Sequence, residues 1–169
     1  IQDQRGTLDK YIGDAIMAVY GAPMSQPDHA RRACLTALGM IKELHALQKK
    51  WEQEGRPFVN IGVGINSGDM VVGNMGSTMR FDYTVMGDMV NLGSRLEGIN
   101  KEYGTNIIIS EYTYEAVKTD MCCRELDSVR VKGKAKPVKI YELLAEKKDE
   151  ADYQGLISAF NLGLELYRK

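Results

Sequence analysis

An aspartate at the tip of a predicted hairpin is the first residue whose type and position could do chemistry. Asp14 follows Gly13 between two apolar runs, and Gly-Asp at such a junction is a two-residue turn signal. A carboxylate fixed on a tight turn can project into a site and ligate Mg²⁺. Aspartates are also frequent in turns because they hydrogen-bond to the local backbone, so both roles stay open for Asp14.

Two polar residues on a predicted helix form the second candidate. Asn91 and Arg95 are four residues apart and share one helix face, while an apolar stripe centred on Leu92 and Leu96 points elsewhere. An arginine can pair with phosphate charge, and an asparagine can bind sugar hydroxyls. A solvated surface explains the pair equally well on this pattern alone.

Glycines are dense in residues 62–76, which invites comparison with phosphate-binding loops. No Gly-Lys-Ser/Thr follows, and no helix begins directly after the stretch. We therefore expect these glycines to allow turns and close backbone approach. The two histidines, His29 and His45, have no acid or thiol partner at a suggestive spacing, so no catalytic triad is predicted.

The apolar pattern predicts the elements that must position these residues. Residues 7–20 form a hairpin, and apolar steps of three and four predict helices from Pro27 to Trp51 and from Asp88 to Tyr103. Alternation in residues 58–72 predicts two strands joined by a turn, and residues 75–87 are expected to be a loop around a short strand.

The second half of the chain adds the rest of one sheet. The expected elements are a buried strand at 107–109, a short helix at 111–118, and a closing hairpin of strands 122–131 and 138–144 around residues 132–134. A charged linker follows at 146–152, and a helical pattern resumes at 156–169. Strands alternating with helices on one sheet predict an α+β or α/β sandwich.

Composition limits the function classes. The 169 residues indicate one domain, and a net charge of −1 argues against an electrostatically driven nucleic-acid binder. Three cysteines without CxxC spacing argue against a disulfide framework or zinc site and favour a reducing compartment. Because no apolar run approaches the roughly 20 residues that span a bilayer, we expect a soluble, cytoplasmic domain whose parent chain is not thereby excluded from a membrane.

Four segments follow one another along residues 1–145: DKYIGDAIMA from Asp9, GVGINSG from Gly62, YTVMGDMVNLGSRLE from Tyr83, and VKGKAKPVKIYE from Val131. Together they resemble the catalytic domain of class III adenylate/guanylate cyclases, of the bacterial adenylate cyclase type. The resemblance implies an α+β fold, a ferredoxin-like βααββαβ sheet-and-helix sandwich. It also implies a head-to-tail homodimer with two shared active sites.

The implied reaction converts ATP to 3′,5′-cyclic AMP and pyrophosphate in signal transduction. Attack of the ribose 3′-oxygen on the α-phosphorus would use two ions, Mg²⁺ or Mn²⁺, because negative charge accumulates on the oxygens involved. By resemblance, Asp14 is one of two metal-binding aspartates and Asn91 orients the ribose. Arg95 stabilises phosphate charge in the transition state, and Lys10 and Thr84 read the purine.

The types of these last two residues favour ATP over GTP. Lys10 can only donate, which suits the bare N1 of adenine, whereas guanine carries a proton on N1. The hydroxyl of Thr84 can accept from the adenine amine. By the resemblance, guanylyl members of the family have Glu at the position of Lys10 and Cys or Ser at the position of Thr84.

The chain departs from the family in two ways. Many members have Asp where this chain has Thr84. A threonine at this position resembles the pattern of a bacterial and cyanobacterial subgroup that is linked to bicarbonate response. The family's first strand and helix, which carry the first metal aspartate, should precede Ile1, so we expect the chain as given to be N-terminally incomplete and inactive.

Two other functions stay open beside the adenylate cyclase. One is a catalytically degenerate cyclase-like module that binds nucleotide or a partner without turnover. The other, a diguanylate-cyclase-like enzyme, lacks support because the hairpin tip reads IGDA rather than GG[DE]EF. Residues 146–169 are expected to be a linker and the start of a C-terminal helical segment similar to a tetratricopeptide helix, and regulatory domains are expected elsewhere in the parent chain.

Overall fold

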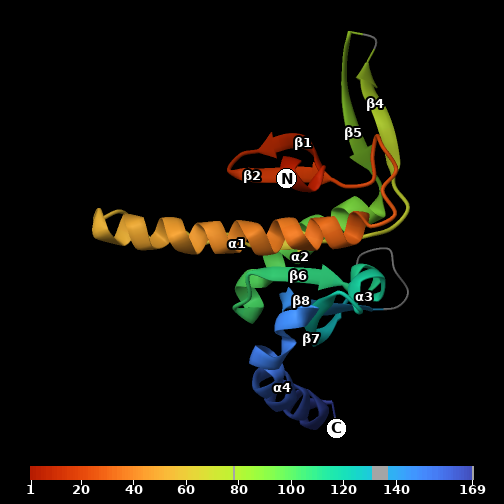
Figure 1. The fold of residues 1–169 in the computed structure, drawn as a ribbon. Helices are drawn as coiled ribbons and strands as arrows, with labels where there is room; N and C mark the ends of the chain where they lie inside the picture. Colours follow the sequence, from red (N-terminus) through yellow and green to blue (C-terminus); the bar gives the residue numbers. More distant parts are fainter. Residues whose placement is uncertain (78, 131–136, 169) are drawn as a thin grey trace.

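The computed structural model describes residues 1–77, 79–130 and 137–168, and Figure 1 traces their path. Its strands are β1 (Thr7–Ile12), β2 (Ala15–Val19), β3 (Val63–Ile65), β4 (Val71–Ser77), β5 (Arg80–Met86), β6 (Ile107–Ser110), β7 (Met121–Val129) and β8 (Val138–Glu146). Its helices are α1 (His29–Gln53), α2 (Asp88–Tyr103), α3 (Glu111–Val117) and α4 (Gln154–Tyr167), with short 3₁₀ helices η1 (Gln2–Gln4) and η2 (Lys147–Tyr153).

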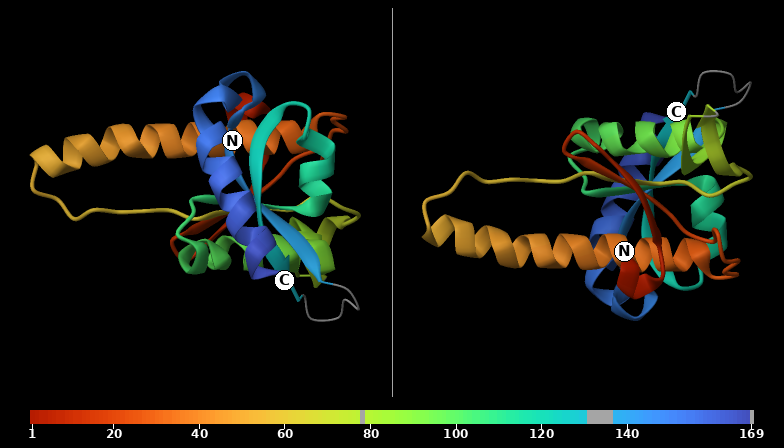
Figure 2. Two further views of the ribbon diagram at one scale, coloured as in Figure 1. Left: turned by 90° about the horizontal axis from the view of Figure 1, so that it is seen from below. Right: turned by 90° about the horizontal axis from the view of Figure 1, so that it is seen from above.

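The core lies on both faces of a four-stranded sheet with strand order β3-β6-β8-β7. β3 pairs parallel with β6, and the other pairs are antiparallel. Alternate residues of a strand point to opposite faces. Ile107 and Ile109 accordingly pack with α1 and α3, whereas Ile108 packs with Leu92 and Leu96 of α2. Figure 2 shows α1 and α2 on opposite sides of these strands.

A glycine on β3 lets α2 lie directly against the sheet. A Cβ at Gly64 would lie 2.3 Å from the backbone nitrogen of Glu97 and 2.3 Å from the carbonyl oxygen of Gly93. Side chains cannot approach backbone this closely, so only glycine fits without moving the helix. The expectation that glycines in this stretch allow close backbone approach is confirmed at this position.

Gly64→Ala is therefore expected to lower the free energy of unfolding by about 1–3 kcal/mol, the usual cost of overpacking. Urea unfolding of the 169-residue chain measures it. Gly73→Ala on β4 is the matched control, because a Cβ there meets nothing within 4 Å. Equal losses for the two variants would contradict the close-packing explanation.

The β1–β2 hairpin, both long helices, β6, α3 and the β7–β8 hairpin lie where the sequence predicts them. The predicted turn at residues 132–134 is outside the described residues. The prediction of a single sheet is wrong, because the described strands form one four-stranded sheet and two separate two-stranded ribbons, β1–β2 and β4–β5.

The predicted strand-turn-strand at residues 58–72 is also wrong. Residues 58–62 are not in a strand, β3 pairs with β6, and β4 pairs with β5 from Val71↔Met86 to Ser77↔Arg80. Between β3 and β4 the side chain of Asn66 donates to the carbonyl oxygen of Met89 and accepts from Ser110, so this segment is tied to α2 and β6 instead of closing a hairpin. The expected loop at residues 75–87 is mostly β5.

The C-terminal helix packs against β7. The guanidinium of Arg124 lies 4.4 Å from the ring centroid of Phe160, and Arg168 pairs with Glu125 at 2.8 Å. The domain division at residues 145/146 and the likeness of α4 to a tetratricopeptide helix stay predictions. No helix in the described ranges is long and apolar enough to cross a membrane.

Candidate active site

The β1–β2 turn presents the candidate metal ligand. Gly13 has φ +63°, a left-handed conformation that glycine adopts without strain, and the turn leaves Asp14 exposed at its tip. Within the described part of the chain the Asp14 carboxylate makes no hydrogen bond or ion pair. The alternative role, a side chain that caps its own turn, therefore has no support from the contacts.

A buried carboxylate on β1 brings the two predicted base-reading residues together. Thr84 on β5 donates a hydrogen bond from Oγ1 to Oδ2 of Asp9 at 2.7 Å. The ammonium of Lys10 lies 3.7 Å from Oδ1 of the same carboxylate. Lys10 and Thr84 are 74 residues apart in sequence, yet both side chains contact Asp9. The hydrogen bond also joins the two hairpins, because Asp9 lies on one and Thr84 on the other.

The predicted polar face of α2 is present. Leu92 and Leu96 are 1 % and 0 % exposed, whereas Asn91 and Arg95 are exposed. α2 begins two residues after β5 ends, so β5 and α2 present Thr84 and this polar face from consecutive elements. No hydrogen bond or ion pair among the described residues joins Asn91 or Arg95 to Asp14, Lys10 or Thr84. One chain thus brings the base-reading pair together but not the whole predicted set.

One chain does not by itself offer a metal site. In the ranges the structure describes, no group of three or more His, Cys, Asp or Glu side chains is arranged to hold a metal ion. Asp14 supplies one exposed carboxylate, whereas Mg²⁺ needs near-octahedral oxygen ligation. Further ligands for Asp14 would have to come from substrate phosphates, water, a second chain or residues not described here.

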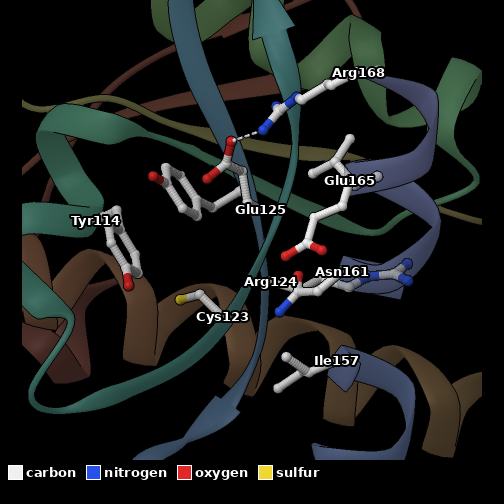
Figure 3. Close-up of a pocket in the computed structure, with 10 residues that line it drawn as sticks. Tyr114, Cys123, Arg124, Glu125, Ile157, Asn161, Glu165 and Arg168 are labelled. Carbon is white, nitrogen blue, oxygen red and sulfur yellow. Dashed lines mark ion pairs between the residues drawn. The ribbon is translucent and has the colours of Figure 1, made fainter. Parts of the chain in front are cut away.

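A surface pocket of about 440 Å³ near the C-terminus is a competing place for a ligand. Figure 3 shows charged side chains of β7 and α4 facing one another across it, with Glu125 and Arg168 paired. None of Lys10, Asp14, Thr84, Asn91 and Arg95 lines it. Three of its charged lining residues are paired, Arg124 with Glu142 at 2.5 Å and Arg168 with Glu125, and the second pair joins α4 to β7.

Sequence reasoning missed Asp9 as part of this site. Asp9 begins one of the four segments that carry the resemblance, but a polar residue within a short strand is typical of a solvent-facing side chain. A shift of register between Leu8 and Lys10 leaves Asp9 without a partner on β2, and its side chain is only 3 % exposed. A bulge of this kind changes the direction of side chains, and the local sequence pattern does not predict it.

Comparison with known proteins agrees with the motifs. Residues 4–145 match the family described as adenylate and guanylate cyclase catalytic domain. Over 139 residues the chain is 37 % identical to adenylate cyclase 1 of Rhizobium meliloti, covering 82 % of this chain and 21 % of that protein. It spans less than a third of the length of two further curated adenylate cyclases that it matches.

Solved structures give the same result for the fold. The adenylyl cyclase CyaB from P. aeruginosa superposes with a TM-score of 0.78 at 35 % identity, covering 88 % of this chain and 76 % of that one. The guanylyl cyclase Cya2 superposes with a TM-score of 0.73, also at 35 % identity, covering 88 % of this chain and 74 % of that one. The non-canonical dimeric guanylyl cyclase domain of the RhoGC fusion protein from Blastocladiella emersonii superposes with a TM-score of 0.68 at 31 % identity, covering 86 % of this chain and 75 % of that one.

These matches cover most of the chain at identities above 30 %. The family match over residues 4–145 includes the elements that carry Lys10, Asp14, Thr84, Asn91 and Arg95. The matches confirm the α+β fold, and the equal identity to an adenylyl and a guanylyl cyclase leaves the base open. The chain belongs to the adenylate and guanylate cyclase catalytic domain family.

Proposed function

We propose that this domain is an adenylate cyclase. In the reaction the ribose 3′-hydroxyl of ATP loses its proton, its oxygen bonds to the α-phosphorus, and the bond to the β-phosphate oxygen breaks to release pyrophosphate. The observation that carries ATP as substrate is the pair of Lys10 and Thr84 held on one carboxylate. Sequence identity is 35 % both to an adenylyl and to a guanylyl cyclase of known structure, so it does not favour either nucleotide, and the preference for ATP rests on Lys10 and Thr84.

Donor and acceptor chemistry makes the pair selective. An ammonium has three donors and no acceptor, so Lys10 complements the lone pair on adenine N1 and opposes the N1 proton of guanine. The side chain of Lys10 is 40 % exposed, which leaves part of it accessible to a nucleotide. The Thr84 hydroxyl stands beside it to accept from the adenine amine.

The remaining residues take roles around the triphosphate. We assign Arg95 to the charge that develops on the phosphate oxygens, where a guanidinium stabilises charge without a proton transfer, and Asn91 to the ribose. Asp14 contributes one carboxylate to a site for two ions, Mg²⁺ or Mn²⁺. Bound there, the ions would supply an acidified 3′-hydroxyl and charge neutralisation of the triphosphate.

A dimer explains why one chain leaves the set incomplete. In the proposed homodimer, Asp14 of one chain meets Lys10, Thr84, Asn91 and Arg95 of its partner, so that two symmetric sites form. The exposed positions of Asp14, Asn91 and Arg95 in the isolated chain leave all three available to a partner.

Residues 1–169 alone are expected to show little or no cyclase activity with either metal, because one aspartate cannot hold two ions against triphosphate repulsion. The restored chain is defined as residues 1–169 preceded by the first strand and helix that the family resemblance implies. It should form cyclic AMP and pyrophosphate from ATP. Chromatography of the products with Mg²⁺ and with Mn²⁺ makes the comparison. Robust turnover by residues 1–169 would show that the metal site is misplaced.

The second candidate is a degenerate module that binds nucleotide without turnover, with which a single chain without a metal-holding cluster among its described residues is equally compatible. Calorimetric titration of the restored chain with ATP separates the two functions. Binding without cyclic AMP under any metal would support the degenerate module over the enzyme.

A further inference from the structure

We propose that Asp9 is the positioning residue that makes Thr84 an acceptor and thereby sets adenine selectivity; this inference rests on the adenylate cyclase function proposed above. Asp9 need not touch the nucleotide for this role. It acts through the two side chains that do, the Thr84 hydroxyl and the Lys10 ammonium.

The hydrogen bond to Thr84 carries the argument. A threonine hydroxyl has one proton and two lone pairs, and it can present either to a ligand. A carboxylate oxygen accepts hydrogen bonds, and Oδ2 of Asp9 takes the Thr84 proton at 2.7 Å. Only lone pairs then remain on Oγ1 for a base. Lone pairs accept from the exocyclic amine of adenine and oppose the carbonyl oxygen at the same place on guanine.

Burial keeps this arrangement fixed. The Asp9 side chain is 3 % exposed, and the bulge between Leu8 and Lys10 turns it toward β5. Its second oxygen, Oδ1, is buried without a hydrogen-bond partner among the described residues, an arrangement that costs free energy. The ammonium of Lys10, 3.7 Å from Oδ1, compensates part of this cost through its positive charge. The same carboxylate thereby holds the Lys10 ammonium on the side of Thr84.

A purely structural role is the alternative, because the same hydrogen bond ties β1 to β5. The two roles differ in substrate dependence. A structural defect lowers turnover of every nucleotide, whereas loss of the acceptor removes only the advantage of substrates that carry the amine. Purine riboside triphosphate, which has adenine N1 but no amine, is the probe that separates them.

The experiment compares kcat/KM for ATP and for purine riboside triphosphate in the restored chain and its variants. Asp9→Asn, whose amide can donate to Thr84 and turn the hydroxyl around, is expected to lower the ratio about tenfold, mainly through KM for ATP. Thr84→Val should lower it similarly. In the Thr84→Val background, Asp9→Asn should change the ratio less than about threefold, because the two residues act as one unit.

Two further variants complete the test. Asp82→Asn on β5 makes the same chemical change at an exposed position and should leave the ratio unchanged. Asp9→Leu has a similar shape without an acceptor, so the Thr84 hydroxyl is no longer held with its lone pairs toward the base. The ratio should fall in this variant too, though less than in a folded Asp9→Asn, and thermal unfolding reveals which variants fold. If Thr84→Val lowers the ratio while folded Asp9 variants keep it, the inference about Asp9 is overturned and the proposed function stands. If neither Thr84 nor Lys10 variants alter the preference for ATP, the base-reading assignment itself fails.

Discussion

The restored chain is expected to use ATP about ten to a hundred times more efficiently than GTP, measured as kcat/KM. The reason is a mispaired donor: Lys10 would face the N1 proton of guanine with N–H groups of its own, and an unpaired or opposed donor costs about 1–3 kcal/mol. Initial rates of cyclic AMP and cyclic GMP formation under the same metal give the ratio. Comparable turnover of both nucleotides would refute the base-reading assignment.

Exchanging the pair tests the same idea from the other side. The double variant Lys10→Glu with Thr84→Cys is expected to lose ATP turnover by more than it gains GTP turnover. The new acceptor would stand beside the Asp9 carboxylate, whose charge now repels it instead of holding it. Lys42→Glu reverses the same charge at an exposed position on α1 and serves as the control. An efficient guanylyl cyclase from two substitutions would show that Asp9 does not constrain this place.

Local patterns were enough for much of the scaffold. The helices α1 and α2 follow from apolar residues at steps of three and four, and the β1–β2 hairpin from a Gly-Asp turn between apolar runs. The polar face of α2 followed from the same periodicity, since a helix that buries Leu92 and Leu96 must turn Asn91 and Arg95 away. Each of these predictions depends on residues within a few turns of one another.

Strand partners could not be found this way. Alternation shows that a residue is extended but not which strand it pairs with. It therefore predicts a hairpin for β3, which instead pairs with β6, more than forty residues away. The β4–β5 ribbon has exposed apolar residues such as Val71 and Phe81, so it lacks the buried-face alternation that marks a strand. Asp9 was missed for a similar reason, because its hydrogen bond crosses from β1 to β5.

Site sharing between two chains gives the second large effect. Asp14→Ala and Arg95→Ala, each made separately in the restored chain, are expected to be nearly inactive as homodimers. In the proposed C₂ dimer both sites of each variant lose a required group. Asp3→Ala, another exposed aspartate, is the control and should keep its activity. Steady-state cyclic AMP formation measures all three.

Mixing the two inactive variants should restore activity. A mixed dimer places both lesions in one site, where the altered Asp14 meets the altered Arg95, and leaves the other site intact. With random pairing about half of the dimers are mixed, and one of their two sites works, so recovery should approach about a quarter of the control. Had both residues served a site within one chain, every site would carry a lesion and mixing would restore nothing. Exchange of subunits is checked by pulling down one tagged variant and detecting the other. Exchange without recovery would show that Asp14 and Arg95 do not act across an interface.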